Sequence, residues 1–160
     1  MMMKIVSPKG KYKDDCIYQD IVDYITQDSK CRSGHVITRN LNRDSIADDM
    51  LKLDEEFNKK KGTRIRHTII SFEDQDCATP EIVADIAEQA CNFYAGEYQT
   101  VAAVHEDTSN LHFHMVMHTT NIHNGKKYTG RKKDYHQFQA HLKKIGRQHN
   151  IKYRGTRSDD

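Results

Sequence analysis

Residues 99–119 constrain the fold of this 160-residue chain more strongly than any other stretch. Residues 99–105 are mostly apolar and favour a strand, and residues 111–119 alternate between Leu, Phe or Met and mostly His. Residues 106–110 between them are polar and typical of a turn. The pattern predicts a β-hairpin, and a hairpin in the middle of the chain favours a largely antiparallel sheet.

Three histidines lie on this predicted hairpin with the spacing H-x6-H-x-H: His105, His112 and His114. If His105 pairs across from His112, Ala103 pairs with His114, and side chains opposed across an antiparallel pair share a face. A lone histidine in a strand is usually a half-buried polar residue, but three on one face predict a metal site. Imidazole suits Zn, Mn, Co, Ni or Cu, and three ligands leave positions open for an anion such as phosphate.

The charge of the chain is distributed unevenly along its length. The formal net charge is +2, but residues 121–160 carry a net +8 and the residues before them a net −6. A basic segment beside a site that attracts phosphate indicates a nucleic-acid partner. A solvated helix face followed by a loose tail is the alternative explanation. The best candidates for DNA contacts are Lys126, Lys127, Arg131, Lys132, Lys133, Lys143, Lys144 and Arg147.

The composition argues against insertion into a membrane. The chain is 36% hydrophobic with a mean hydropathy of −0.87, and no apolar run approaches the roughly 20 residues that a membrane helix needs. No signal peptide is visible. The four cysteines have neither C-x-x-C spacing nor the pattern of a disulfide framework, so we expect free thiols in a reducing cytoplasm.

The remaining periodicities predict an α+β domain with a central, mostly antiparallel β-sheet flanked by helices. We expect the helices to cover one face of the sheet and the histidines to lie on the other face or at one end. One domain is predicted over residues 1–153, with a flexible tail at 154–160. The expected strands are 3–6, 35–38, 64–72 and 126–129 besides the hairpin. The expected helices are 15–26, 80–96, 135–149 and one that is capped by Asp44 or Ser45 and ends in residues 59–62.

Three blocks of this sequence resemble conjugative relaxases, the site- and strand-specific DNA nickases of mobile elements, and in particular their P-type mobilisation group. Residues 23–30 (DYITQDSK) resemble the block that carries the nucleophilic tyrosine. Residues 66–72 (RHTIISF), followed by acidic residues and Thr-Pro-Glu at 79–81, resemble the second block. Residues 105–121 resemble the three-histidine block, and Gly-Lys-Lys-Tyr at 125–128 resembles the segment that commonly follows.

The resemblance implies an HUH endonuclease or relaxase-like two-layer sandwich that acts in the bacterial cytoplasm. It implies nicking at the transfer origin of a plasmid or integrative element, with Tyr24 becoming linked to the 5′ phosphate and later religation. The implied cofactor is a divalent metal ion, Mn or Mg in function, with Zn, Ni or Co also compatible. The implied partners are single-stranded DNA, accessory relaxosome proteins and a coupling protein. Because relaxases generally carry further domains, a nuclease segment of a longer protein is expected.

Tyr24 is the predicted nucleophile among eight tyrosines. A tyrosine that attacks a phosphodiester forms a phosphotyrosine, which conserves the bond energy for religation. The phenol has a pKa of about 10 and needs help, which a metal on the scissile phosphate supplies. Ile17, Ile21 and Ile25 form an apolar stripe that is expected to include Tyr24 and to leave Tyr18 offset. A buried core aromatic is the alternative role for Tyr24, and Tyr18 is the fallback nucleophile.

A carboxylate or a carbonyl is expected to hold the second nitrogen of a metal-binding histidine. Asp76 is the first candidate because it lies closest to where the relaxase family carries an acid, and Glu73 and Asp74 are alternatives. Each of them could equally be a solvated loop charge. His67 in the second block is expected to be structural, and His118 stands where relatives often have asparagine.

Two competing functions use the same residues. A rolling-circle replication initiator or a transposase has the same metal and tyrosine chemistry, but those proteins usually place the tyrosine after the histidines, whereas Tyr24 precedes them here. A non-catalytic, metal-stabilised DNA-binding module would unfold without metal and would form no covalent adduct with DNA. An RNA-processing phosphoesterase with two H-x-[ST] motifs is set aside, because only His118-Thr119-Thr120 matches.

Overall fold

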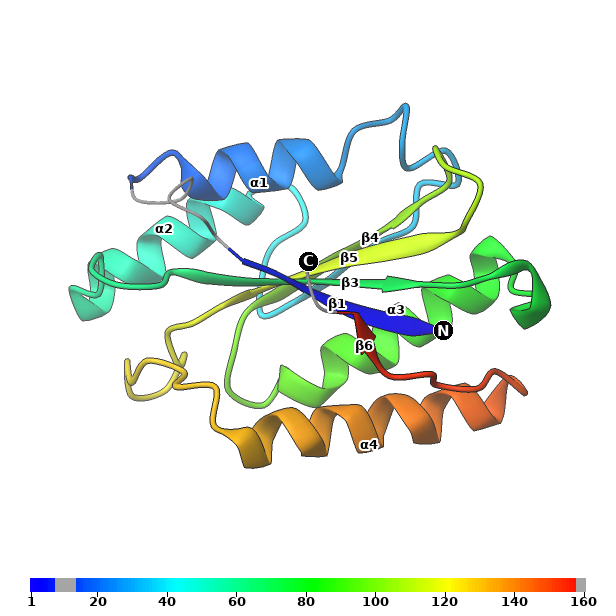
Figure 1. Ribbon diagram of the computed structural model, residues 1–160. Coiled ribbons are helices and arrows are strands. Elements are labelled where there is room, and N and C mark those ends of the chain that lie inside the picture. The colour runs from blue at the N-terminus through cyan, green and yellow to red at the C-terminus, as the bar shows by residue number, and fades with distance from the viewer. Residues whose placement is uncertain (8–13, 158–160) are drawn as a thin grey trace.

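A six-stranded sheet forms the centre of the protein in the computed structural model, which describes residues 1–7 and 14–157 (Figure 1). The strand order is β2-β4-β5-β3-β1-β6. Neighbouring strands are antiparallel except β1 and β6, which are parallel. The strands are β1 Met2–Val6, β2 Val36–Arg39, β3 Ile65–Ser71, β4 Thr100–His105, β5 His112–His118 and β6 Thr156–Arg157.

Helices cover both faces of this sheet. Figure 1 shows α1 and α2 above it and α3 and α4 below it. The predicted class, α+β with a mostly antiparallel sheet flanked by helices, is therefore confirmed, but the sheet is the middle of three layers and not one of two. The helices are α1 Ile17–Ile25, α2 Ile46–Phe57, α3 Pro80–Tyr94 and α4 Lys132–Gln148, with a 3-10 turn at Asp74–Asp76.

Two apolar cores follow from the alternation of side chains along the central strands. Ala102 and Val104 of β4 and Phe113 of β5 pack with α3 and α4. Val101 and Ala103 of β4 point the other way and pack with α1 and α2. All six residues of β4 are buried, so the middle of the sheet is closed to solvent on both faces.

The predicted register of the hairpin is confirmed. His105 lies opposite His112, and Ala103 lies opposite His114. Elsewhere the local predictions were less accurate. The predicted strand 126–129 is reduced to an isolated bridge between Thr120 and Lys127, and α4 begins at Lys132, earlier than the expected residue 135. All four cysteines are free, and no helix among the described residues is long and apolar enough to cross a membrane.

Residues 154–157, the first part of the predicted C-terminal tail, contact the N-terminal strand. Thr156 and Arg157 form β6 beside Met3 and Lys4. Arg154 donates hydrogen bonds to both carboxylate oxygens of Asp76, at 2.6 and 3.1 Å. The last three residues of that predicted tail, 158–160, lie outside the described residues.

Asp76 joins the two ends of the described chain. The amino group of Met1 donates to Asp76 Oδ2 at 3.0 Å, and both groups are buried. Burial acts to raise the pKa of Asp76, but the hydrogen bonds from Arg154, from the Glu73 backbone N–H and from the amino terminus outweigh it and hold the pKa at about 2. The carboxylate is thus a buried counter-ion for two cations.

We predict that Asp76→Asn lowers the free energy of unfolding by about 3 kcal/mol, because removing one partner of a buried ion pair leaves the other uncompensated. Urea unfolding monitored by circular dichroism measures the change. Asp74→Asn is the matched control, since Asp74 is an exposed carboxylate on the same turn, and it should change stability by less than about 0.5 kcal/mol. Equal effects of the two substitutions would contradict the structural role of Asp76.

Candidate metal centre and nucleophile

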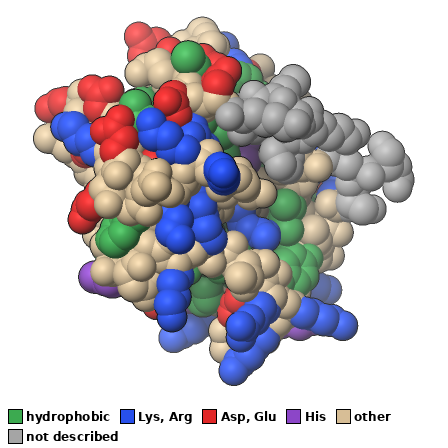
Figure 2. All heavy atoms as spheres, turned by 90° about the vertical axis from the view of Figure 1, so that its left-hand side faces the viewer, with side chains coloured by type: hydrophobic (Ala, Val, Ile, Leu, Met, Phe, Trp, Pro, Cys, Tyr) green, Lys and Arg blue, Asp and Glu red, His purple; other side chains and the backbone are tan. Residues whose placement is uncertain are grey.

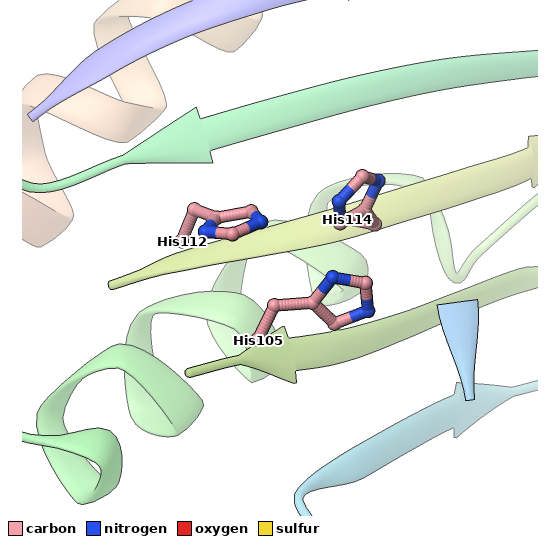
Figure 3. A group of neighbouring side chains, drawn as sticks. All are labelled: His105, His112 and His114. Carbon is pink, nitrogen blue, oxygen red and sulfur yellow. The ribbon is translucent and has the colours of Figure 1, made fainter. Parts of the chain in front are cut away.

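Three imidazoles converge at one end of the β4–β5 pair, on the face covered by α1 and α2 (Figure 3). One ring nitrogen from each of His105, His112 and His114 lies within 4.8 Å of the other two. The ring centroids of His105 and His114 are 4.3 Å apart, and that of His112 is 5.2 Å from each. The sequence-predicted ligands are therefore brought together by the register of the hairpin.

The second nitrogen of each histidine is already engaged. His105 Nε2 lies 2.7 Å from the carbonyl oxygen of Ile25, and His112 Nδ1 lies 3.0 Å from that of Asn110. His114 Nδ1 lies 2.7 Å from His67 Nε2. One nitrogen per ring is held by the protein and the other is available as a ligand, which is the arrangement that a metal-binding histidine requires. The donor set therefore fits a divalent metal ion.

His67, which the sequence suggested was structural, is the direct partner of His114. Ligation of a metal through His114 Nε2 requires the proton on Nδ1, which then donates to His67 Nε2. His67 must in turn carry its own proton on Nδ1, an atom that is buried without a hydrogen-bond partner in the described part of the chain. Burial lowers the pKa of His67 to about 4 and that of His114 to about 2, so both rings are neutral near pH 7.

Tyr24 lies beside the histidines at the end of α1. Its ring centroid is 5.7 Å from that of His114 and 6.5 Å from that of His105, and the side chain is 44% exposed. The ammonium of Lys30 lies over the ring at 3.8 Å from its centroid. The carbonyl of Ile25, which has no partner within the helix, is the group that His105 holds. One hydrogen bond therefore links the residue after Tyr24 to a predicted metal ligand.

Tyr18 and Tyr24 have the opposite exposures to those expected from the stripe on α1. Tyr18 is 1% exposed, bonded to Asp54 and 2.9 Å from His118 Nε2. Because Val22 also faces the core, the centre of the buried stripe lies near Tyr18, and Tyr24 falls at its edge. Burial and the hydrogen bond to Asp54 raise the pKa of Tyr18, which makes it poorly suited to nucleophilic attack.

The predicted orienting acids do not contact the histidines. Asp76 is occupied by Met1 and Arg154, and no carboxylate within residues 1–7 and 14–157 bonds to His67 or to the three clustered histidines. Sequence reasoning thus missed His67 as the hydrogen-bond partner of His114. The available signal was the position of His67 in a strand whose alternate residues face α1 and α2. Recognising its partner required knowledge that β3 pairs with β5. In that pairing His114 lies opposite Ile69, two residues from His67.

The predicted DNA-binding cations gather away from the histidines. Lys126, Lys127 and residues 131–133 follow the opposite end of β5, about 20 Å from His112 along a seven-residue strand. Figure 2 views that end of the molecule, where lysine and arginine side chains crowd the centre and the lower part. Lys143, Lys144 and Arg147 are exposed on α4, on the far side of the sheet.

The fold and the histidine cluster fit the HUH motif of relaxase nuclease domains. The chain belongs to this family, since residues 24–151 match the family described as "Relaxase: MobA/VirD2-like, nuclease domain". The match begins at Tyr24 and includes all three clustered histidines. No solved structure matches the chain.

Two longer relatives share part of this sequence. The chain is 32% identical over 123 residues to protein TraI of Escherichia coli, a match that covers 73% of this chain and 16% of TraI. It is 35% identical over 75 residues to the group II intron-interrupted relaxase LtrB of Lactococcus lactis subsp. cremoris strain MG1363, covering 46% of this chain and 13% of LtrB. The matched region is therefore a small part of either relative.

We predict that His67→Phe weakens binding of Mn²⁺ or Zn²⁺ by about 10- to 100-fold, because His114 loses the partner that orients it. Isothermal titration of the chelator-stripped protein measures the affinity. His67→Gln should retain part of the affinity, since its amide oxygen can accept from His114 Nδ1. His136→Phe, an exposed substitution on α4, is the control and should bind metal as tightly as the wild type. Unchanged affinity in His67→Phe would rule out the orienting role.

Proposed function

We propose that this chain nicks one strand of DNA at the transfer origin of a plasmid or integrative element by attack of Tyr24 on a phosphodiester. The observation that carries the proposal is the position of Tyr24, an exposed tyrosine whose ring edges against two of three converging histidines. Membership of the relaxase family supports this reaction over that of a rolling-circle initiator or a transposase.

The reaction exchanges one phosphate ester for another. The Tyr24 oxygen loses its proton and bonds to phosphorus, the bond from phosphorus to the 3′ oxygen breaks, and that oxygen takes up a proton. The 5′ phosphate remains on Tyr24, and the released 3′ hydroxyl can later attack the phosphotyrosine and religate the strand. Lys30, over the tyrosine ring, adds positive charge near the incoming phosphate.

The histidines prepare the site for the phosphate. His105, His112 and His114 would hold a divalent ion, which neutralises phosphate charge and orients the group for in-line attack when bound. Mn²⁺ or Mg²⁺ is the proposed functional ion. His67, Ile25 and Asn110 keep the rings in a ligating orientation. The proposed substrate is single-stranded DNA at the transfer origin, presented with the help of relaxosome and coupling proteins.

We predict that Tyr24→Phe reduces covalent adduct formation by more than about 10³-fold, as expected for loss of a nucleophile. The protein is incubated with Mn²⁺ and labelled single-stranded DNA spanning the element's own transfer origin, and a denaturing gel separates free DNA from a band shifted by the mass of the protein. Chelator should abolish the same band.

Tyr18→Phe is the matched control, because it removes a second tyrosine hydroxyl from the same helix. We expect it to be less stable by about 1–3 kcal/mol through the loss of buried hydrogen bonds, yet still to form the adduct. An adduct that survives Tyr24→Phe would move the nucleophile elsewhere. Tight metal binding without any adduct would favour a DNA-binding module without catalytic activity.

A further inference from the structure

A cavity of about 320 Å³ lies on the face of the sheet opposite the histidines. Its floor is formed by side chains of β1, β3 and β5, and its wall by the first turns of α4 and the segment before it. This volume is at the lower end of the range of small-molecule sites. Neither the metal centre nor Tyr24 contributes to its lining, so the cavity needs a separate explanation.

Aromatic rings and one guanidinium shape this cavity. Tyr94 and Tyr128 meet edge to face with ring centroids 6.2 Å apart, and the Arg66 guanidinium lies 4.8 Å from the centroid of Tyr128. Gly130 leaves the space that Arg66 occupies, because a Cβ at that position would lie 2.0 Å from Nη2. Arg66 forms no ion pair with a carboxylate in the described ranges 1–7 and 14–157. Its N–H groups are therefore available to an acceptor that enters the cavity.

The surroundings of the cavity are basic, and its mouth is apolar. Lys132 contributes to the lining, and Arg131 and Lys133 are its exposed neighbours on the chain. Ile5 also lines the cavity and is 39% exposed. Figure 2 shows hydrophobic side chains at the right of this basic end of the molecule, next to lysine and arginine. A ligand for such a site combines a flat apolar body with acceptor atoms and a negative charge.

We propose that this cavity binds one unstacked nucleobase of the same DNA strand that the metal centre cleaves. The inference rests on the proposed function, because single-stranded DNA is the ligand. The flat face of a base can stack on the tyrosine rings, and its ring nitrogens and carbonyl oxygens can accept hydrogen bonds from the Arg66 guanidinium. The phosphates next to that base would then lie near the cations at residues 131–133. The cavity is thus a second DNA contact, on the opposite face of the sheet from the nicking site.

An abasic scan tests this assignment. Fluorescence anisotropy measures binding of a labelled single-stranded oligonucleotide from the transfer origin, with each base removed in turn and the phosphates retained. EDTA is present, so metal-dependent binding and cleavage do not contribute. For the wild type we expect one position at which loss of the base weakens binding by about tenfold, within the range that stacking on an aromatic side chain contributes.

Two substitutions should remove that tenfold penalty by different means. Arg66→Gln removes the guanidinium, and Ile5→Trp places a bulky ring at the mouth without changing charge. Arg43→Gln is the matched control, since Arg43 is an exposed arginine that does not line this cavity, and it should keep the penalty. Circular dichroism shows whether each variant is folded.

The proposal would be overturned if, in the wild type, removal of each base weakened binding equally. It would also be overturned if both Arg66→Gln and Ile5→Trp kept the tenfold loss of affinity at one position. Failure of the proposed nicking reaction is seen separately, as the absence of an adduct in Mn²⁺ with any variant, because the binding comparison in EDTA does not depend on cleavage.

Discussion

The geometry of the candidate metal centre depends on the hydrogen-bonded ladders on either side of β5. One ladder places His114 opposite Ala103 of β4, and the other places it opposite Ile69 of β3. Because side chains alternate between faces, a slip of one residue in either ladder would turn the imidazoles towards the wrong core. The pairing of β4 with β5 brings His105 to His112 and His114. The pairing of β3 with β5 brings His67 into contact with His114. The convergence of the three candidate ligands and the contact of His67 with His114 therefore both depend on how β5 pairs with its two neighbours.

The position of Tyr24 depends on a buried polar network at the other end of α1. Tyr18 bonds to Asp54 of α2, His118 Nε2 lies 3.2 Å from Asp54 Oδ1, and Arg64 Nε lies 3.7 Å from Oδ2. Burying such charges is costly unless each has partners. The partners of Asp54 come from three separate segments, so the network forms only when α1, α2, β5 and the start of β3 are correctly placed. Tyr24, six residues after Tyr18, is then held at the histidines.

Much of this arrangement could be predicted from local patterns. The period of two in residues 111–119 and the turn before them determined the hairpin, its register and the convergence of His105, His112 and His114. The exposure of Tyr24 was predicted wrongly because Ile17, Ile21 and Ile25 alone misplace the centre of the buried stripe. The contact of His67 depends on the pairing of β3 with β5, since its partner His114 is 47 residues away, and the partners of Asp76 lie 75 and 78 residues away. No local periodicity encodes such distant contacts.

The basic side chains expected to bind DNA lie apart from the histidines and Tyr24, where cleavage is proposed. The histidine end contributes imidazoles and Lys30, whereas the predicted DNA-binding cations lie at the other end of β5 and along α4. Phosphate contacts supply a large share of the affinity of a DNA-binding protein and make it sensitive to salt. On the proposed reaction, these contacts are therefore made at a distance from the bond that is cleaved. Since the sheet separates the cavity beside Arg66 from the histidines, a strand occupying both sites must pass around an edge or an end of the sheet. Nicking would then require a strand long enough to make that turn, so that the length of single-stranded DNA, as well as its sequence, selects the substrate.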